Sequence, residues 1–502
     1  MIDHVFVVML ENRSFDHLLG FSQIQGKDPA GNPTKIDGLS GEESNVSIDG
    51  SKVKVSTPAD FALNYGPGHE FKDVREQLCG REGTYSSPTP QPGEIDPKIN
   101  NSGYISNYSL YDRENPGTIM KCFSPEQLPV LATLAKEFAL CDRWFSSMPG
   151  PTWPNRFFIH AGSSGGLDDS PAFSREFKSI LYDGFKFENG TIFDELENRR
   201  HDWMIYCDDE FPQALSIAGM RKHSKRFKPF SSFRQDLSDP QFSKSYVFIE
   251  PDYHAFTGKF RGGNSQHPMD DMTRGDKLLK DVYEAIRNSP HWETSLLIIT
   301  YDEHGGFCDH VVPPVAVSPG DSITDPSNNH NNFDFKQLGV RVPTVIISPL
   351  IPKGIIDHTI YDHTSVLATI EKLFGLGSLT KRDAAANSLN HLLKLDTPRN
   401  NAPVSLPDPA VSGLRFKEEE EEKKKNPITS FFADVITGRI SLFKREPIDP
   451  SLAGFHHVAF IRDSQDSSES ERERLSKRFL AHKKNGAVKY MRQVKRKVAN
   501  KV

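Results

Sequence analysis

The sequence of 502 residues is poor in cysteine and has no pattern that would join its cysteines. The five that it contains are widely spaced, and no two of them form a Cys-x-x-Cys pair. An odd number of scattered cysteines argues against a disulfide framework, and the absence of close pairs argues against a zinc site made of thiolates. We therefore expect free thiols in a reducing compartment. The five are Cys79, Cys122, Cys141, Cys207 and Cys308.

Long hydrophobic runs and an excess of positive charge are also missing. No uninterrupted apolar stretch approaches the roughly 20 residues that a helix needs to cross a bilayer. The chain begins Met-Ile-Asp-His, without the basic segment, apolar core and cleavage site of a secretory signal peptide. A formal net charge of −6 gives no overall basic field to attract nucleic acid. These absences predict a cytoplasmic protein with no membrane-spanning segment and no nucleic-acid partner.

Short apolar runs alternate along the chain with amphipathic segments, which is typical of the α/β class with a mostly parallel sheet covered on both faces. The strands are predicted at 4–10, 203–207, 246–250, 295–301 and 343–348. The helices are predicted at 124–140, 191–198, 274–287 and 365–374. Ser124, Pro125 and Gln127 give the first helix an N-cap and capping-box signal, although Pro129 lies inside it. Residues 21–60 and 80–120 are predicted to form long loops, which compact domains tolerate mainly around a site.

The composition changes after residue 395, which we take as the end of a catalytic domain formed by residues 1–395. Residues 396–430 are rich in Pro and then carry five Glu followed by three Lys, as expected of a linker. Residues 431–502 form a small C-terminal region, and its last part, 472–502, holds twelve Lys or Arg against one acid. Such a tail suits peripheral contact with an anionic membrane surface, or it is a solvated helical tail; both interpretations stay open.

Polar side chains directly follow two of the predicted strands. Glu11 and Asn12 follow the first strand, in "VVMLENRSFDHLLG", and Asp302 and Glu303 follow another, in "TYDEHGGFCDH". Open α/β sheets place their sites at the carboxyl ends of the strands, so the two pairs are expected to meet at one edge. Carboxylates crowded together cost several kcal/mol in desolvation and repulsion, a cost that a bound cation removes. The sequence therefore predicts a site for one divalent cation.

A structural interpretation without a metal is available for each stretch. In it, Asn12 and Asp16 cap the next helix and Asp302 occupies a turn. The occurrence of both pairs after comparable strands favours the metal site. Its donors are all oxygen atoms, which suits hard cations, so Ca²⁺ is favoured and Mg²⁺, Mn²⁺ or Zn²⁺ stay as alternatives.

Thr152 is the candidate nucleophile, in the segment "SSMPGPTWPNRFFIHAG". A Pro-Gly-Pro turn precedes it, and Pro154 marks the place where a helix can begin. A hydroxyl at a helix entrance feels the positive potential of free backbone N–H groups, which favours its alkoxide and also stabilises phosphate. The alternative is that Thr152 is an ordinary N-cap.

Several motifs, in this order, resemble the phosphoesterase family of bacterial and plant non-specific phospholipases C and related acid phosphatases. They are "ENRSFDHLLG", "GPTWPNR", "TYDEHGGFCDHVVPP", "GVRVPTVIISPLIPKG" and "DHTSVLATIEKLFG". The resemblance covers roughly residues 1–395, and "LTKRDAAA" with "TPRNNAPVSLPDP" extends it toward the plant phospholipases. It implies an alkaline-phosphatase-like α/β/α sandwich with a mostly parallel central sheet and, here, a small C-terminal extension.

The resemblance also implies roles for particular residues. The metal ligands that it implies are Glu11, Asn12, Thr152, Asp302 and Glu303. Thr152 matches the nucleophile, His69 and His267 match histidines that line the phosphate pocket, and Asn155 is expected to bind phosphate beside them. His310 and His363 are expected to brace the site from behind. One departure from the family pattern is Asp270, which stands where relatives often have a histidine. It bears on the choice of substrate more than on the type of reaction.

The predicted reaction has two steps. Thr152 attacks phosphorus to give a phosphothreonine while His69 or His267 acts as the acid, and water then releases the phosphoryl group. The predicted function is a phospholipase C that hydrolyses glycerophospholipids such as phosphatidylcholine to diacylglycerol and the phosphorylated head group. The alternatives are an acid phosphatase acting on soluble phosphomonoesters and a catalytically silent membrane-binding protein.

Overall fold

The computed structural model describes residues 2–171, 184–209, 212–254, 260–322 and 328–416. The charged run from residue 417 and the basic tail, whose two interpretations are membrane contact and a solvated helix, lie outside the described residues. Within the described part of the chain, no helix is long and apolar enough to cross a bilayer. The five cysteines all lie within the described part and are free thiols.

A ten-stranded mixed sheet forms the centre of the molecule, in the order β3-β2-β12-β6-β11-β10-β1-β9-β7-β8. Most neighbours are parallel, but β11 runs antiparallel to both β10 and β6, and β2 and β3 are antiparallel. The strands are β1 (His4–Leu10), β2 (Gln25–Lys27), β3 (Pro33–Lys35), β6 (Ala139–Cys141), β7 (Trp203–Cys207), β8 (Phe227–Pro229), β9 (Tyr246–Glu250), β10 (Ser295–Tyr301), β11 (Thr344–Ile347) and β12 (Ile355–Asp357). A separate two-stranded sheet pairs β4 (Ser44–Val46) with β5 (Lys52–Lys54).

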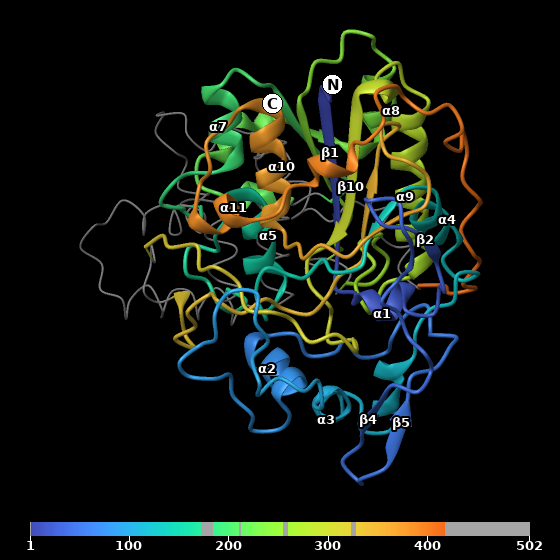
Figure 1. The fold of residues 1–502 in the computed structure, drawn as a ribbon, viewed down its shortest axis with the longest axis vertical. Helices are drawn as coiled ribbons and strands as arrows, with labels where there is room; N and C mark the ends of the chain where they lie inside the picture. The colour runs from blue at the N-terminus through green and yellow to red at the C-terminus, as the bar shows by residue number, and fades with distance from the viewer. Residues whose placement is uncertain (1, 172–183, 210–211, 255–259, 323–327, 417–502) are drawn as a thin grey trace, which may run out of the picture.

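Helices cover both faces of the sheet (Figure 1). One group, whose members contact one another, comprises α4 (Pro129–Glu137), α8 (Phe233–Leu237) and α9 (Met272–Arg287). The other comprises α5 (Thr152–Ala161), α7 (Ile192–Asn198), α10 (Thr364–Phe374) and α11 (Lys381–Ala385). Two helix layers with a mostly parallel sheet between them confirm the predicted α/β class.

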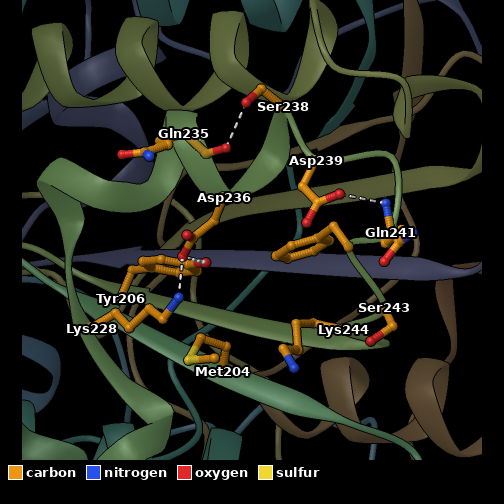
Figure 2. Close-up of a pocket in the computed structure, with 11 residues that line it drawn as sticks. Met204, Tyr206, Lys228, Gln235, Asp236, Ser238, Asp239, Gln241, Ser243 and Lys244 are labelled. Carbon is orange, nitrogen blue, oxygen red and sulfur yellow. Dashed lines mark hydrogen bonds and ion pairs between the residues drawn. The ribbon is translucent and has the colours of Figure 1, made fainter.

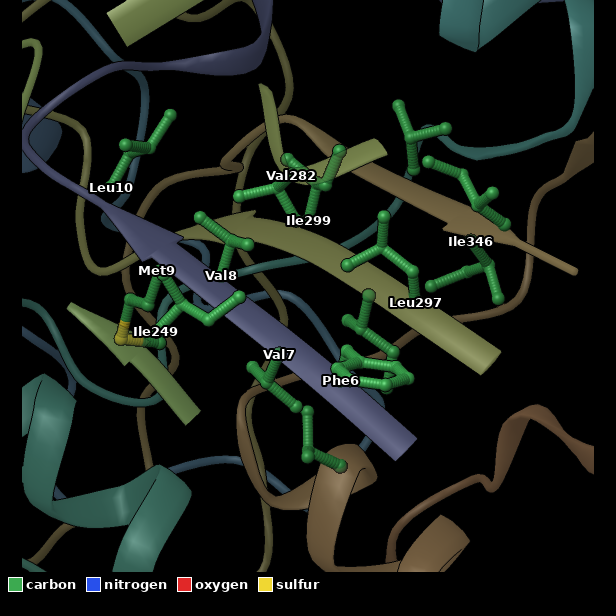
Figure 3. Close-up of a cluster of buried hydrophobic side chains, with 14 of the residues drawn as sticks. Phe6, Val7, Val8, Met9, Leu10, Ile249, Val282, Leu297, Ile299 and Ile346 are labelled. Atoms are coloured by element: carbon green, nitrogen blue, oxygen red, sulfur yellow. The ribbon is translucent and has the colours of Figure 1, made fainter. Parts of the chain in front are cut away.

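β1 and β10 lie next to each other at the centre of the sheet, and all seven residues of each are buried. Burial on both faces explains why each strand is a continuous apolar run. Their register pairs His4 with Ser295 and Leu10 with Tyr301, so the two strands end at the same level. Side chains of β1, β9, β10, β11 and α9 belong to one core cluster (Figure 3). The polar residues that follow β1 and β10 are thereby fixed on one rim.

The predicted helix at 124–140 is wrong at both ends. α4 begins at Pro129, because proline lacks the N–H that an interior position needs and suits a first position. The Gln127 side chain still accepts a hydrogen bond from the Ser124 N–H at 3.1 Å, but this pair closes a turn before the helix. The N–H groups of Val130 and Leu131 are accepted by the Asp276 carboxylate of α9. The last predicted residues instead form β6, a strand that the sequence analysis missed.

The other predicted elements are confirmed with small shifts at their ends. β1, β7, β9 and β10 match their predicted bounds, and β11 is shorter by one residue at each end. α7 begins after a capping box made by Thr191 and Asp194, and α9 begins at Met272 with Asp271 as its N-cap.

A cap lies beyond the carboxyl ends of β1 and β10; we use this name for residues 44–122. It contains β4, β5, α2 (Phe71–Cys79), α3 (Tyr104–Tyr108) and the 3₁₀ helix η1 (Pro116–Met120), which lie below α1 (Phe15–Leu19) in Figure 1. The cap has a small core of its own, in which Tyr104 and Ile105 pack with Phe307 from the segment after β10. The loop-rich sequence there thus folds over the edge of the sheet that carries the polar residues.

The chain returns across α9 after the last helix, as a segment that we call the strap, residues 399–407. The Tyr283 hydroxyl donates to the Pro403 carbonyl at 2.6 Å, and Arg287 donates to the Ala402 carbonyl at 3.2 Å. The Leu406 N–H donates to the Glu284 carboxylate at 3.0 Å. Part of the segment expected as a linker is therefore bound along a helix of the main body.

Candidate active site

The polar residues that follow β1 and β10 lie against each other and against the start of α5. The Asn12 N–H donates to Asp302 Oδ1 at 2.9 Å. The Asn12 side-chain amide donates to Thr152 Oγ1 at 3.1 Å and also to Glu303 Oε1. Glu11, the preceding residue, is close enough for the charge of Asp302 to raise its pKa. The five residues predicted as ligands therefore come together at one place.

The backbone reaches this arrangement through unusual conformations at two positions. Asn12 has a φ of 58°, in the left-handed region that asparagine tolerates better than most residues. Gly305 has a φ of 65°, and a Cβ there would lie 2.1 Å from the Asn12 carbonyl oxygen. At Gly306, a Cβ would lie 2.7 Å from the Gly68 carbonyl oxygen. The two glycines let the ends of β1 and β10 and a loop of the cap approach one another.

Thr152 is the first residue of α5, after Pro151 as N-cap, and its side chain is partly exposed. Its hydroxyl therefore does not cap the helix, which removes the ordinary N-cap interpretation. The Asn155 side chain accepts from the Met148 N–H at 3.0 Å and donates to the carbonyls of Gly150 and Pro151. These bonds tie Asn155 to the Pro-Gly-Pro turn, and the phosphate binding expected of it stays a prediction.

Arg156 is a functional residue that the sequence analysis missed. It is buried one turn after Thr152, and its Nε donates to Asp302 Oδ2 at 3.1 Å. Its other nitrogens donate to the carbonyls of Met9 and Leu10 and to the Tyr253 hydroxyl. The guanidinium thus ties α5 to the ends of β1 and β10. The signal in the sequence is its spacing of four residues from Thr152, which places both on one face of the helix.

The negative charge of the three carboxylates is only partly balanced, by the ion pair of Arg156 with Asp302. Burial, and then the neighbouring Asp302, raises the pKa of Glu11 well above its usual range. Burial also raises the pKa of Asp302 to about 6, against the opposing charge of Arg156. Burial acts in the same direction on the pKa of Glu303, but the charges of His69 and His304 outweigh it and the net shift is downward.

The donors present fit a hard divalent cation. Glu11 Oε2 and Asn12 Oδ1 are buried and have no hydrogen-bond partner. Buried carboxylate and amide oxygens without partners are rare, since desolvation without a replacement bond costs about 1–3 kcal/mol each. A cation bound by these oxygens would remove this cost and balance the charge of the three carboxylates.

The two histidines predicted to line the phosphate pocket lie near each other, but their pKa values are shifted in opposite directions. Their rings are 6.3 Å apart, edge to face. His69 Nδ1 donates to the Pro67 carbonyl at 2.9 Å. Burial lowers the pKa of His69, but the charges of Glu303 and Glu70 outweigh it and the net shift is upward. The pKa of His267 is instead far below its usual value, because of burial and then the charges of His69 and Arg13.

The loop that carries His267 is held by the residue that departs from the family pattern. The Asp270 carboxylate accepts from the Gly263 N–H at 3.1 Å and from the Ser265 hydroxyl at 3.0 Å. Ser265 Oγ in turn accepts from the His267 N–H at 3.2 Å. Asp270 therefore acts on the position of His267 through Ser265.

The two histidines expected behind the site occupy different places. His363 Nε2 donates to the Asp302 carbonyl at 2.6 Å, while its Nδ1 accepts from the Trp144 indole at 3.3 Å. Burial lowers the pKa of His363 to about 4, in keeping with a neutral ring. His310 instead lies between Asp16 and Asp37, and its pKa rises to about 10 because the hydrogen bonds that its ring donates to both carboxylates outweigh burial. Only His363 bonds directly to a predicted metal ligand.

Asp16, Asp309 and His310 form a second group that could hold a metal ion, with ligand atoms within 4.8 Å of one another. The Arg341 guanidinium already lies on this group, 2.9 Å from an oxygen of each aspartate. An arginine in that position supplies the positive charge that an ion would bring. In the group around Glu11, Arg156 pairs with Asp302, but Glu11 Oε2 and Asn12 Oδ1 stay without a partner, so this group fits an ion better.

A hollow of about 450 Å³ lies away from these residues, beside β7, β8 and α8 (Figure 2). Its two lysines are both paired, Lys228 with Asp236 at 2.8 Å and Lys244 with Asp202. None of the predicted site residues lines it. Because both of its lysines are already paired with carboxylates, we expect no charged ligand to bind in the hollow.

Comparison with known proteins gives one family. The profile of the Phosphoesterase family matches residues 2–377. Non-specific phospholipase C6 of Arabidopsis thaliana is 38% identical over 84% of this chain and 77% of its own length. Non-specific phospholipase C3 of the same plant is 35% identical over 87% of this chain and 81% of its own length. Phospholipase C B of Mycobacterium tuberculosis is 26% identical over 82% and 81%.

The likeness to solved structures is weaker. The phosphonate monoester hydrolase of Agrobacterium radiobacter is 13% identical, with a TM-score of 0.32, over 55% of this chain and 74% of that one. A protein in the alkaline phosphatase superfamily from Vibrio parahaemolyticus is 13% identical, with a TM-score of 0.31, over 51% and 63%. Scores this low add nothing to the site itself. The sequence matches confirm the family that the motifs indicated.

Proposed function

Because the chain belongs to the phosphoesterase family, we propose that it is a metal-dependent phospholipase C acting on glycerophospholipids such as phosphatidylcholine. The observation that carries this proposal is that the Asn12 side-chain amide donates both to Thr152 Oγ1 and to Glu303 Oε1, and so links the hydroxyl to a carboxylate at one rim. The names of the relatives support the substrate class. The products would be diacylglycerol and the phosphorylated head group.

Glu11, Asn12, Thr152, Asp302 and Glu303 would hold the cation, with Ca²⁺ favoured by the all-oxygen donors. When bound, it would polarise the phosphoryl oxygens and lower the pKa of the Thr152 hydroxyl. The start of α5 adds backbone N–H groups near the same hydroxyl, which favour the alkoxide and the phosphoryl oxygens alike. Thr152 is also accessible, since it is partly exposed in a largely buried setting.

The reaction would then follow two displacements. Thr152 gives its hydroxyl proton to solvent, its Oγ forms a bond to phosphorus, the bond from phosphorus to the glycerol oxygen breaks, and the leaving alkoxide takes a proton from His69. Water then attacks the phosphothreonine and gives a proton to His69, the bond from phosphorus to Thr152 Oγ breaks to release the phosphorylated head group, and the threonine alkoxide takes a proton back from solvent. The protein returns to its starting state after each turnover.

The hydrogen bonds of the His69 and His267 rings suit the two histidines to different roles. His69 donates from Nδ1–H to the Pro67 carbonyl, which leaves Nε2 for the substrate, and the charges of Glu303 and Glu70 raise its pKa against the effect of burial, which favours its protonated form. His267 is neutral, and its Nδ1 accepts from the Met269 N–H at 3.4 Å, so its Nε2–H is a hydrogen-bond donor without charge. We assign the acid to His69 and a clamp on the phosphoryl oxygens to His267.

Two substrates and two variants test this function. The full chain with Ca²⁺ is assayed on phosphatidylcholine vesicles and on soluble p-nitrophenyl phosphate, as wild type, Thr152→Ala and Thr152→Ser. Diacylglycerol should form from the vesicles, Thr152→Ala should abolish it, and Thr152→Ser should retain a measurable fraction because it keeps the hydroxyl. Full turnover by Thr152→Ala would show that Thr152 is not the nucleophile. Hydrolysis of the soluble monoester alone would instead identify an acid phosphatase.

A further inference from the structure

We propose that Gln77, on helix α2 of the cap, is a positioning residue that holds the metal ligand Glu303 and the loop of His69 in register with each other. The inference rests on the proposed function, since it assigns Glu303 and His69 their roles there. Gln77 touches neither the reacting hydroxyl nor any predicted ligand, so it would act through its neighbours.

Gln77 is 1% exposed and makes three hydrogen bonds with its side chain. Its Nε2 donates to the Gly68 carbonyl at 2.8 Å and to Asn107 Oδ1 at 2.9 Å. Its Oε1 accepts from His304 Nε2 at 2.7 Å. These partners fix the orientation of the amide. If it were reversed, its oxygen would face the oxygens of Gly68 and Asn107 and its N–H group would face the His304 donor.

The first branch of this network leads to the metal ligand. His304 is 1% exposed, and its Nδ1 lies 3.3 Å from Glu303 Oε2. Gln77 holds the other nitrogen of the same ring, so it fixes the plane in which the ring meets Glu303. Partners behind a ligand orient it, and removing such a partner typically weakens metal binding by about 10- to 100-fold.

The second branch leads to the predicted acid. Gly68 immediately precedes His69, and the His69 ring is held by the Pro67 carbonyl on the other side. The same loop lies in close contact with Gly306. A Cβ at Gly306 would lie only 2.7 Å from the Gly68 carbonyl oxygen. One amide of the cap therefore positions both the loop of the acid and, through His304, the ligand that follows β10.

Asn107 on α3 anchors Gln77 from outside. Its side-chain amide donates to Asp73 Oδ1 at 2.9 Å and to Glu76 Oε2 at 3.2 Å, which leaves Oδ1 facing Gln77. Residues of α2 and α3 thus form one hydrogen-bonded chain that ends at His304, which lies 3.3 Å from Glu303. A chain of this kind stays in place only if each member has its partner, since an unpaired buried polar group is costly.

The test compares Gln77→Leu, Gln77→Glu and Gln337→Leu in the full chain. Gln337 is a matched control, because it is 2% exposed and donates only to the carbonyls of Pro313, Pro314 and Leu338. Ca²⁺ binding is measured by calorimetry without substrate, and kcat and KM are measured on phosphatidylcholine vesicles. Folding of each variant is checked by circular dichroism.

Gln77→Leu should weaken Ca²⁺ binding about tenfold, and it should lower kcat about tenfold with a smaller change in KM. Gln77→Glu should keep most of the Ca²⁺ affinity, because its carboxylate still accepts from His304, but it should lower kcat because it cannot donate to Gly68. Gln337→Leu should leave both quantities close to those of the wild type.

A folded Gln77→Leu with the affinity and kcat of the Gln337→Leu control would overturn the proposal. If Gln77→Leu does not fold, Gln77→Glu decides, and a kcat equal to that of the control would overturn it as well. A wild-type chain that binds no Ca²⁺ would refute the proposed metal site and this inference together. Wild-type binding with unchanged variants would refute the inference alone.

Discussion

The side-chain amide of Asn12 lies 3.1 Å from Thr152 Oγ1, although 140 positions separate the two residues in the chain. Asn12 follows the central strand β1, and Thr152 begins a helix on one face of the sheet. The contact therefore joins the rim of the sheet to the N-terminus of α5. This junction is where a phosphoryl group would meet a hydroxyl, backbone donors and metal ligands at once.

Replacement of Gly305 by alanine should damage the site more than it damages the fold. The new Cβ would lie 2.1 Å from the Asn12 carbonyl oxygen, at a residue with a φ of 65°. We expect a loss of about 1–3 kcal/mol in the free energy of unfolding, and at least a tenfold loss of kcat. Thermal unfolding and the vesicle assay measure the two effects.

Gly375→Ala is the matched control for this prediction. Gly375 has a φ of 67°, but nothing lies within 4 Å of the position of its Cβ. It should lose a similar part of the stability and keep its turnover. Equal activities of the two variants would show that the contact at Asn12 is unimportant.

Arg156→Met should be strongly destabilising. It removes the guanidinium that donates to Asp302 and to two carbonyls at the end of β1, and it leaves a buried carboxylate unpaired. The expected loss in the free energy of unfolding is about 3–5 kcal/mol, as for other broken buried ion pairs. Urea unfolding measures it, and Arg156→Lys should recover only part because a lysine cannot make the same set of bonds. A wild-type unfolding curve for Arg156→Met would contradict the role given to this residue.

Removal of divalent metal should lower the melting temperature and abolish turnover, and Ca²⁺ should restore both. A ligand that binds only the folded state stabilises it by about 1.4 kcal/mol for each tenfold rise in free concentration above its Kd. The rise in melting temperature with Ca²⁺ is the measurement.

Two variants tell the candidate metal groups apart in that experiment. Glu11→Gln should remove the dependence on Ca²⁺, because it takes away an oxygen that has no other partner. Asp16→Asn should keep it, since Arg341 already balances that group. The opposite result would place the ion at Asp16, Asp309 and His310.

His160 should make the protein sensitive to acid. Both of its ring nitrogens are buried without a partner, and burial lowers its pKa from 6.5 to about 3. Below pH 6.5 the unfolded chain takes up a proton that the folded state refuses, so the stability is full above this pH and falls as the pH drops toward 3. Between these two pKa values, the free energy of unfolding should fall by about 1.4 kcal/mol for each pH unit.

His160→Phe tests this dependence, because the ring already packs against Phe193 and Phe248. The variant should match the wild type at pH 8 and be more stable than it at pH 4 in urea unfolding. Parallel pH profiles of the two proteins would show that His160 does not titrate in this range.

The rim of the sheet was predictable because its signal is local. β1 and β10 are buried on both faces, so each appears as an apolar run with polar residues immediately after it. Helix α4 was predicted too long because a cap signal at Ser124 and an amphipathic pattern hide the break at Pro129. The antiparallel insertion of β11 between β10 and β6 has no signature in the sequence, since it depends on which strands pair.

The partners of the supporting residues could not be predicted for a related reason. Arg156 reaches Asp302 across 146 positions, and Gln77 reaches His304 across 227. Nothing next to either residue in the sequence indicates its partner. Asn155 also makes hydrogen bonds to Met148, Gly150 and Pro151 that the sequence analysis did not predict, while the phosphate binding implied by the resemblance stays a prediction.

The strap limits where the protein can be shortened. A truncation at residue 395 would delete the carbonyls of Ala402 and Pro403 and leave Arg287 and Tyr283 of α9 without these acceptors. It would also expose the part of the hydrophobic core against which Ala402 and Leu406 pack. A truncated protein meant for crystallisation or for tests of the C-terminal region should therefore keep the chain to at least Pro407.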